Sequence, residues 1–199
     1  MNNSIFNELS AEKRTKIIYA ALEEFSVNGY ELCSTNKIVN KAGISKGSLF
    51  KYFDTKETLF FFLIDYVVQK MSKRPLKLSD NLFERIRQYA TYEFDFYLEN
   101  PIEYNFLKKA FYDENSAMTT KTVEKYTSQA EEIFYELCQS PEFDLKRQKE
   151  LADILKWVLK GFNEEFILLH KTETKKMKEI YLKELDRYLI ILKKIMEVK

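Results

Sequence analysis

The sequence predicts an all-α fold of about nine helices. The 199 residues include only four Gly and three Pro, while 45% of the residues are hydrophobic and 32% are charged. This composition suits long helices better than turn-rich sheets. Apolar residues recur at spacings of three and four along most of the chain, and no segment shows a convincing strand pattern. A chain of this length can bury most of its apolar surface when it folds.

Capping residues define the first two helices. Ser10 is a favourable N-cap for the first helix, and Gly29 supplies its C-terminal stop. Ser34 or Thr35 caps a short second helix that ends at Gly43. The apolar residues at helical spacing are Ile18, Ala21, Leu22 and Phe25 in the first helix, and Ile38 and Ala42 in the second.

The third helix is capped by Ser45 and spans residues 46–52. Leu49 and Phe53 lie one turn apart, so both can face inward at roughly 100° per residue. The outward face then carries Gly47, Ser48 and Lys51, with Phe50 and Tyr52 beside it. Small, hydroxylated and cationic groups of this kind can approach base edges and phosphates in a major groove.

Proline marks three of the breaks between the remaining helices. A fourth helix begins within residues 54–57 and ends near Ser72. The breaks fall at Arg74-Pro75, Asn100-Pro101 and Ser140-Pro141. The later helices are expected at residues 79–99, from Pro101 onward, and at 119–139, 146–170 and 173–198.

The first three helices follow the helix-turn-helix plan, in which a short helix, a Gly-containing turn and a second short helix are braced by a longer one. The net charge of only +1 hides a local excess of cations, which nucleic-acid binding requires. Between Cys33 and Lys56, Asp54 alone opposes Lys37, Lys41, Lys46, Lys51 and Lys56. Charge alone also allows these lysines to be a solvated face on an ordinary helical bundle.

Residues 42–53 read AGISKGSLFKYF and form part of a longer pattern. The pattern also contains Arg14, Ile17-Ile18, Ala21, Phe25, Gly29, Ser34-Thr35, Ile38, Lys56-Glu57 and Leu59. Together these residues resemble the signature of TetR/AcrR-family transcriptional regulators over about the first 60 residues. The resemblance implies an N-terminal three-helix helix-turn-helix domain at 1–55 and a larger C-terminal helical domain at 56–199, which binds an effector and dimerises.

The resemblance also implies contacts with double-stranded operator DNA at matching positions. These are Thr35 in the second helix, Ser45, Lys46, Gly47, Ser48, Phe50, Lys51 and Tyr52 at the third, and Lys56. Leu49 and Phe53 would be core residues. The chain has Phe50 where Tyr is usual, which removes a hydroxyl contact with phosphate, and Val39 where Ala is usual, which changes packing only.

The last two helices each carry one apolar stripe. The stripes are Leu151, Leu155, Val158, Phe162, Phe166 and Leu169 in one helix, and Met177, Tyr181, Leu185, Tyr188, Leu192 and Ile195 in the other. Periodicity alone allows both stripes to close the core of a single chain, whereas the resemblance implies a homodimer through these helices. A two-fold dimer would read an operator that is an inverted repeat.

The chain is rich in aromatic residues, with 16 Phe, 13 Tyr and one Trp. Such rings can line a pocket for a small hydrophobic or aromatic effector. The candidate pocket residues are Tyr89, Tyr92, Phe96, Phe106, Phe134, Trp157 and Phe162. The neighbouring acids Glu93, Asp95 and Asp113 would suit a cationic aromatic effector. Core packing is the alternative for any single ring.

The sequence argues against an enzyme, because His170 is its only histidine and it has no glycine-rich phosphate loop or nucleophile elbow. Cys33 and Cys138 are far apart, so we expect no disulfide, metal site or cofactor. Without a signal peptide or a membrane-spanning run, the chain is expected in the cytoplasm.

The predicted function is a ligand-relieved repressor. The alternative is an architectural or protein-partnered DNA binder without a small-molecule effector.

Overall fold

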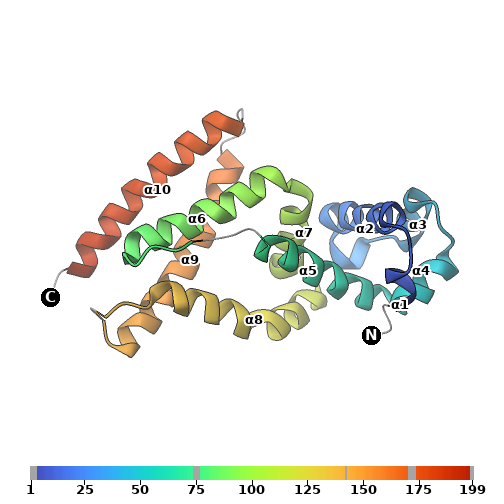
Figure 1. Ribbon diagram of the computed structural model, residues 1–199, viewed down its shortest axis with the longest axis horizontal. Coiled ribbons are helices and arrows are strands. Elements are labelled where there is room, and N and C mark those ends of the chain that lie inside the picture. The colour runs from blue at the N-terminus through green and yellow to red at the C-terminus, as the bar shows by residue number, and fades with distance from the viewer. Residues whose placement is uncertain (1–3, 74–76, 142, 170–173, 198–199) are drawn as a thin grey trace. The chain divides into compact units, whose positions relative to one another are not determined.

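The computed structural model describes residues 4–73, 77–141, 143–169 and 174–197, and within these ranges all regular structure is helical (Figure 1). The all-α prediction is therefore confirmed. The helices are α1 (Ser4–Asn7), α2 (Ala11–Leu32), α3 (Thr35–Ala42), α4 (Lys46–Phe53), α5 (Lys56–Ser72), α6 (Leu82–Glu99), α7 (Pro101–Tyr112), α8 (Ala117–Cys138), α9 (Leu145–Leu169) and α10 (Thr174–Glu197). Of the sequence predictions, the break at Arg74-Pro75 and His170 lie outside the described residues.

Nine of these helices correspond to the predicted ones, and α1 is an addition that the sequence analysis missed. The polar N-terminus hides a short apolar pair, Ile5 and Phe6, of which Phe6 is only 1% exposed. The Phe6 ring packs on the Phe53 ring, with 4.8 Å between the ring centroids. This contact is the reason that so short a helix is held in place.

Gly29 interrupts α2 but does not end it. Its φ of 65° and ψ of −170° are non-helical, yet helical structure resumes and continues to Leu32. Such backbone angles are nearly restricted to glycine. A Cβ at this position would also lie 2.5 Å from Oδ2 of Asp113. The predicted stop at Gly29 is therefore a kink within α2, and its backbone angles require glycine.

The chain forms two compact units, each with its own core. The N-terminal unit comprises α1 to α5, α7 and the first part of α8, to Lys125. Its core contains the rings of Phe25, Phe60 and Phe106, which meet edge-on or tilted with centroids 5.2 to 6.1 Å apart. The division into functional domains at residues 55 and 56 remains a prediction.

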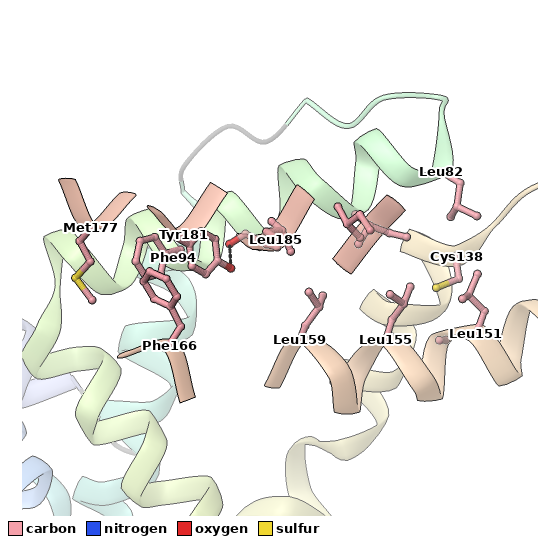
Figure 2. Close-up of a cluster of buried hydrophobic side chains, with 14 residues drawn as sticks. Leu82, Phe94, Cys138, Leu151, Leu155, Leu159, Phe166, Met177, Tyr181 and Leu185 are labelled. Carbon is pink, nitrogen blue, oxygen red and sulfur yellow. Dashed lines mark hydrogen bonds between the residues drawn. The ribbon is translucent and has the colours of Figure 1, made fainter. Parts of the chain in front are cut away.

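The C-terminal unit comprises α6, the rest of α8, α9 and α10. Figure 2 shows its core, where the rings of Phe94 and Tyr181 stack with 3.8 Å between their centroids. The buried Tyr181 hydroxyl donates to Oδ1 of Asn163 at 2.7 Å and lies 3.2 Å from the carbonyl oxygen of Ala90. These contacts satisfy the polar groups that burial removes from water and fix α10 against α6 and α9.

Candidate functional site

The segment α3–turn–α4 has the local geometry of a helix-turn-helix. The Ser34 Oγ accepts a hydrogen bond from the Lys37 backbone N–H at 3.4 Å, so Ser34 rather than Thr35 is the N-cap of α3. Gly43 ends α3 in the left-handed conformation, with φ 68° and ψ 37°. The Ser45 Oγ then accepts from the Ser48 N–H at 3.0 Å and starts α4. Each boundary follows from a local capping preference.

The two faces of α4 differ as predicted. Leu49 and Phe53 are each 1% exposed and anchor the helix in the core of the N-terminal unit. On the opposite side Lys46, Gly47 and Lys51 are exposed. Ser48 and Phe50 are partly exposed on α4, as is Thr35 in the first turn of α3. A Cβ at Gly47 would touch only Oγ of Ser45, at 3.9 Å, so the backbone is open to close approach from outside.

Tyr52 differs from the other predicted DNA-contact residues of α4 because its side chain is 9% exposed. Its ring lies against Phe6 and Phe53, with centroid distances of 5.9 and 6.4 Å. Any contact of Tyr52 with DNA would therefore be limited to the polar end of the side chain. The sequence analysis placed Tyr52 beside the outward face because α1, which carries Phe6, was not predicted.

The predicted excess of cations is reduced by acids from α2. Lys37 lies 3.9 Å from Glu24, and Lys41 forms an ion pair with Glu23. Sequence reasoning missed both acids because they precede the cationic segment in the chain. A local signal was available, since Glu23-Glu24 adjoins the apolar face of the first helix. Such exposed pairs contribute little to stability but neutralise charge locally.

Lys56 has partners that the sequence did not reveal. Its ammonium donates to the carbonyl oxygens of Cys33 at 3.0 Å and Glu31 at 3.4 Å, and it lies 4.7 Å from the centroid of the Tyr30 ring. Lys56 thus satisfies carbonyl groups at the end of α2. Within the described ranges, the cations of α3, α4 and the start of α5 that have no ion pair or hydrogen bond are Lys46 and Lys51.

A buried ionic cluster links three helices of the N-terminal unit. Glu103, at 2% exposure, accepts hydrogen bonds from the Tyr19 hydroxyl at 2.9 Å and from the Lys70 ammonium. The Lys70 ammonium also lies 3.1 Å from the Tyr19 oxygen. The cluster joins α2, α5 and α7. Sequence reasoning missed it; the only local signal is an acid in the first turn of a helix that starts with Pro101.

The candidate pocket residues fall into different surroundings. Tyr89 and Phe134 meet edge to face, with 5.7 Å between centroids. Phe106 belongs to the core of the N-terminal unit, whereas Phe162 packs against Phe166 and Tyr181 between α9 and α10. Trp157 is 67% exposed on α9. Phe96 is buried and Tyr92 partly buried on α6. Among the predicted pocket residues, Tyr89 and Phe134 are therefore in direct contact with each other.

The three acids predicted near these rings also differ. Asp95 pairs with Lys178 at 2.6 Å, and Asp113 lies 3.9 Å from Lys109. Glu93 accepts a hydrogen bond from the Tyr89 hydroxyl at 2.8 Å. In the part of the chain that the structure describes, no cation pairs with Glu93. Burial raises the pKa of Glu93 to about 7, against the opposing effect of the Tyr89 hydrogen bond.

The helices α9 and α10 expose a large apolar surface. Among the described residues of these helices, nine large apolar ones are at least 44% exposed: Leu145, Ile154, Trp157, Val158, Leu168, Leu169, Tyr188, Ile190 and Ile191. Between the two helices runs an almost wholly apolar groove of about 140 Å³, lined in part by Val158, Tyr188 and Leu192. The inner residues of the predicted stripes, such as Leu155 and Leu185, are buried. The stripes therefore close the intrachain core and continue onto an exposed surface.

Cys33 and Cys138 are buried free thiols, and burial raises the pKa of each to about 12, so both are protonated at neutral pH. Across the residues that the structure describes, no cluster of His, Cys, Asp and Glu side chains suits a metal ion. None of the described helices combines the length and apolarity needed to cross a membrane.

Comparison with known sequences connects the helix-turn-helix to a family. Residues 17–62, from within α2 to within α5, match the family model of bacterial regulatory proteins of the tetR family. Two relatives from Bacillus subtilis strain 168 are similar to part of the chain. One is the uncharacterized HTH-type transcriptional regulator YdgC, 42% identical over 71 residues, which are 36% of this chain and 34% of the relative. The other is a fatty acid metabolism regulator protein, 32% identical over 73 residues, or 37% and 36% of the two chains.

Comparison with solved structures extends the likeness to the whole fold. A TetR family transcriptional regulator from Chloroflexus aurantiacus superimposes with a TM-score of 0.68 over 96% of both chains, at 21% sequence identity. At this identity the likeness concerns the fold. The sequence matches, in contrast, span only about a third of the curated relatives.

Proposed function

We propose that this chain, whose residues 17–62 match the model of bacterial regulatory proteins of the tetR family, is a transcriptional repressor of that family. In this proposal a homodimer binds a palindromic operator and is released by a small hydrophobic effector. The observation that carries the proposal is α4, whose buried Leu49 and Phe53 hold Lys46, Gly47 and Lys51 on an open outer face.

That face suits a major groove. Exposed lysines can donate to base edges and phosphates, and the bare backbone at Gly47 permits close approach to the duplex. Thr35 at the start of α3, and Ser45, Ser48 and Phe50 at α4, are at least partly exposed and would add shorter contacts. Lys56 retains one N–H after its bonds to two carbonyl groups, and this N–H could meet a phosphate.

Lys51→Ala tests this docking. We expect the operator affinity to fall about tenfold or more, because one specific base contact contributes about 1 to 3 kcal/mol. If Lys51 contacts phosphate instead, the affinity falls equally for all DNA sequences. The slope of log affinity against log salt concentration then decreases by about one. An operator selected from random duplexes and titrated at several salt concentrations distinguishes these cases.

Lys146→Ala is the matched control, because it removes the same charge from an exposed residue of α9. Its operator affinity should stay close to that of the unchanged protein. A Lys51→Ala protein that binds as tightly as this control, or a selection that yields no inverted repeat, contradicts the proposed docking.

The exposed apolar surface of α9 and α10 supports the proposed homodimer. Large exposed apolar patches mark association sites, and two helices from each subunit can form a four-helix interface. A two-fold axis would bring each residue against the same surface of the other subunit. Recognition helices related in this way fit half-sites about 34 to 36 Å apart, or a multiple of that distance.

Ile191→Glu tests the interface. Ile191 is 53% exposed on α10 and borders the apolar groove. The change would place two carboxylates in an apolar interface, so we expect the dimer dissociation constant to rise at least a hundredfold, or about 2.7 kcal/mol. Sedimentation equilibrium measures it. Val27→Glu on α2, where Val27 is 73% exposed, should leave the dimer intact. Equal dissociation constants for both variants would argue against this surface.

The aromatic residues of the C-terminal unit support the proposed effector. Tyr89 and Phe134 already meet there, and rings of this kind line pockets for hydrophobic molecules. A relative that matches 37% of this chain bears the name fatty acid metabolism regulator protein, which agrees with a hydrophobic effector.

A further inference from the structure

Gly161 is a glycine that the packing of a single chain does not explain. It lies inside α9, is exposed and has no positive φ. A Cβ at Gly161 would meet nothing within 4 Å, so no neighbour in the described part of the chain excludes a side chain. Glycine inside a helix is less stable than alanine, because it loses more backbone freedom on folding. A close approach of another backbone to Gly161 would explain its presence.

Two exposed apolar residues lie at equal distances from Gly161 along α9. Ile154 precedes it by seven residues and is 44% exposed, and Leu168 follows it by seven residues and is 70% exposed. Seven residues make almost two helical turns and a rise of about 10 Å, so the three positions form one line along the helix. Trp157, which is 67% exposed, lies about one turn before Gly161 beside this line.

The equal spacing suits a two-fold rotation that makes the two copies of α9 antiparallel. With Gly161 on the axis, Ile154 meets the partner subunit's Leu168, and Leu168 meets the partner subunit's Ile154. The bare backbone at Gly161 lets the two helices approach at the crossing. A parallel pair would bring each residue to its own copy and would not need the equal spacing.

The charges beside this line suit the same arrangement. Lys160 and Glu164 lie on one flank of the line, one residue before and three residues after Gly161. In the antiparallel crossing this flank faces its own copy, and Lys160 lies only about 3 Å along the axis from the partner subunit's Glu164. Each Lys160 can therefore pair with a carboxylate of the other copy. Such exposed pairs add little affinity but help to fix the direction of the helices.

We propose that α9 packs antiparallel on the α9 of a second copy of this chain, with Gly161 at the two-fold axis. This rests on the proposed function, because it assigns the contact point of the proposed homodimer. At a crossing angle of about 20°, as in four-helix bundles, Ile154 and the partner subunit's Leu168 remain in contact. Trp157 then lies beside this contact and is covered by it.

Introduced cysteines test the direction and position of the crossing. The double variant Ile154→Cys with Leu168→Cys, in the full-length protein under mild oxidation, should form covalent dimers. Its two cysteines lie about 20 Å apart in one chain, too far for a disulfide within the chain. Each single variant is a matched control and should give little covalent dimer, because its cysteine lies about 20 Å from its own copy. The native thiols of Cys33 and Cys138 are buried.

Gly161→Leu tests the close approach. The side chain would push the two helices apart, so we expect the dimer dissociation constant to rise at least tenfold. The stability of the single chain should not fall, because leucine favours a helix and meets no neighbour there. Lys146→Leu adds the same side chain at an exposed position near the start of α9 and should change the constant less than twofold. Emission from Trp157, the only tryptophan, follows dissociation on dilution.

The absence of covalent dimers from the double variant, or abundant dimers from Ile154→Cys alone, would overturn the crossing. Equal dissociation constants for Gly161→Leu and Lys146→Leu would do so as well. If such results come from a protein that is dimeric and that Ile191→Glu dissociates, only the crossing is contradicted. An unchanged protein that stays monomeric at every concentration would contradict the proposed homodimer itself.

Discussion

Phe53→Ala is expected to lower the free energy of unfolding by about 3 to 5 kcal/mol. Phe53 is 1% exposed, and its ring packs on Phe6 at 4.8 Å and on Phe62 at 5.0 Å between centroids. Removing the ring leaves a cavity where α1, α4 and α5 meet, and a small core cannot collapse to fill it. Urea denaturation followed by far-ultraviolet circular dichroism measures the change.

Phe50→Ala provides the comparison, because Phe50 lies on the same helix but its ring is partly exposed. Its loss of stability should be clearly smaller. If Phe53→Ala unfolds at the same urea concentration as the unchanged protein, the Phe53 ring does not lie in the core. The orientation of α4, and the outward placement of Lys51, would then be wrong as well.

Glu103→Gln is expected to cost about 2 to 3 kcal/mol of stability at pH 7. Removing one member of a buried ion pair usually costs about 3 to 5 kcal/mol. The Lys70 side chain is 33% exposed, however, so water screens part of its interaction with Glu103, and we reduce the value accordingly. The amide still accepts hydrogen bonds from Tyr19 and Lys70, but without the charge that makes them strong.

The effect of Glu103→Gln should depend on pH. Burial by itself would raise the pKa of Glu103, but hydrogen bonds from Lys70, from its own backbone N–H and from Tyr19 lower it below the ordinary value of 4.5. A depressed carboxyl pKa stabilises the fold above the unfolded pKa, and the contribution is lost as the pH falls through the folded pKa. The difference between the two proteins should therefore be full at pH 7 and shrink below pH 4.5.

Unfolding measured across this range tests the ionic cluster. Glu12→Gln removes an acid that pairs with Lys16 on the surface of α2, and it should change stability little at any pH. A Glu103→Gln protein with a constant stability difference down to acidic pH would mean that Glu103 is not charged in the folded protein. An absence of any difference would mean that the cluster does not hold α2, α5 and α7 together.

Nine of the described helices and their serine N-caps were predictable from the sequence, because they depend on neighbouring residues. Ser10, Ser34 and Ser45 each accept a hydrogen bond from a backbone N–H three residues later, which is a local preference. The inward placement of Leu49 and Phe53 follows from helical spacing alone. The likeness to the tetR family was also readable, because residues 17–62 hold its signature in one stretch.

Partners distant in the sequence were not predicted. Tyr19 and Glu103 are 84 residues apart, and nothing near either residue indicates the other. The carbonyl partners of Lys56 lie 23 and 25 residues before it, so the sequence suggested only a cation at a helix start. The aromatic candidates show the same limit, since a ring at helical spacing does not reveal whether it meets a core, a groove or solvent.

By itself, the sequence determined that this chain forms capped amphipathic helices and that its first third is a helix-turn-helix with an open outer face on α4. The tertiary structure decided which lysines near that face remain unpaired, which rings meet, and that Glu93 has a hydroxyl partner but no cation in the described ranges. The physical reason is the sequence separation over which each interaction acts. Caps and periodicity act within a few residues, whereas charge pairing and burial depend on side chains that only folding brings together.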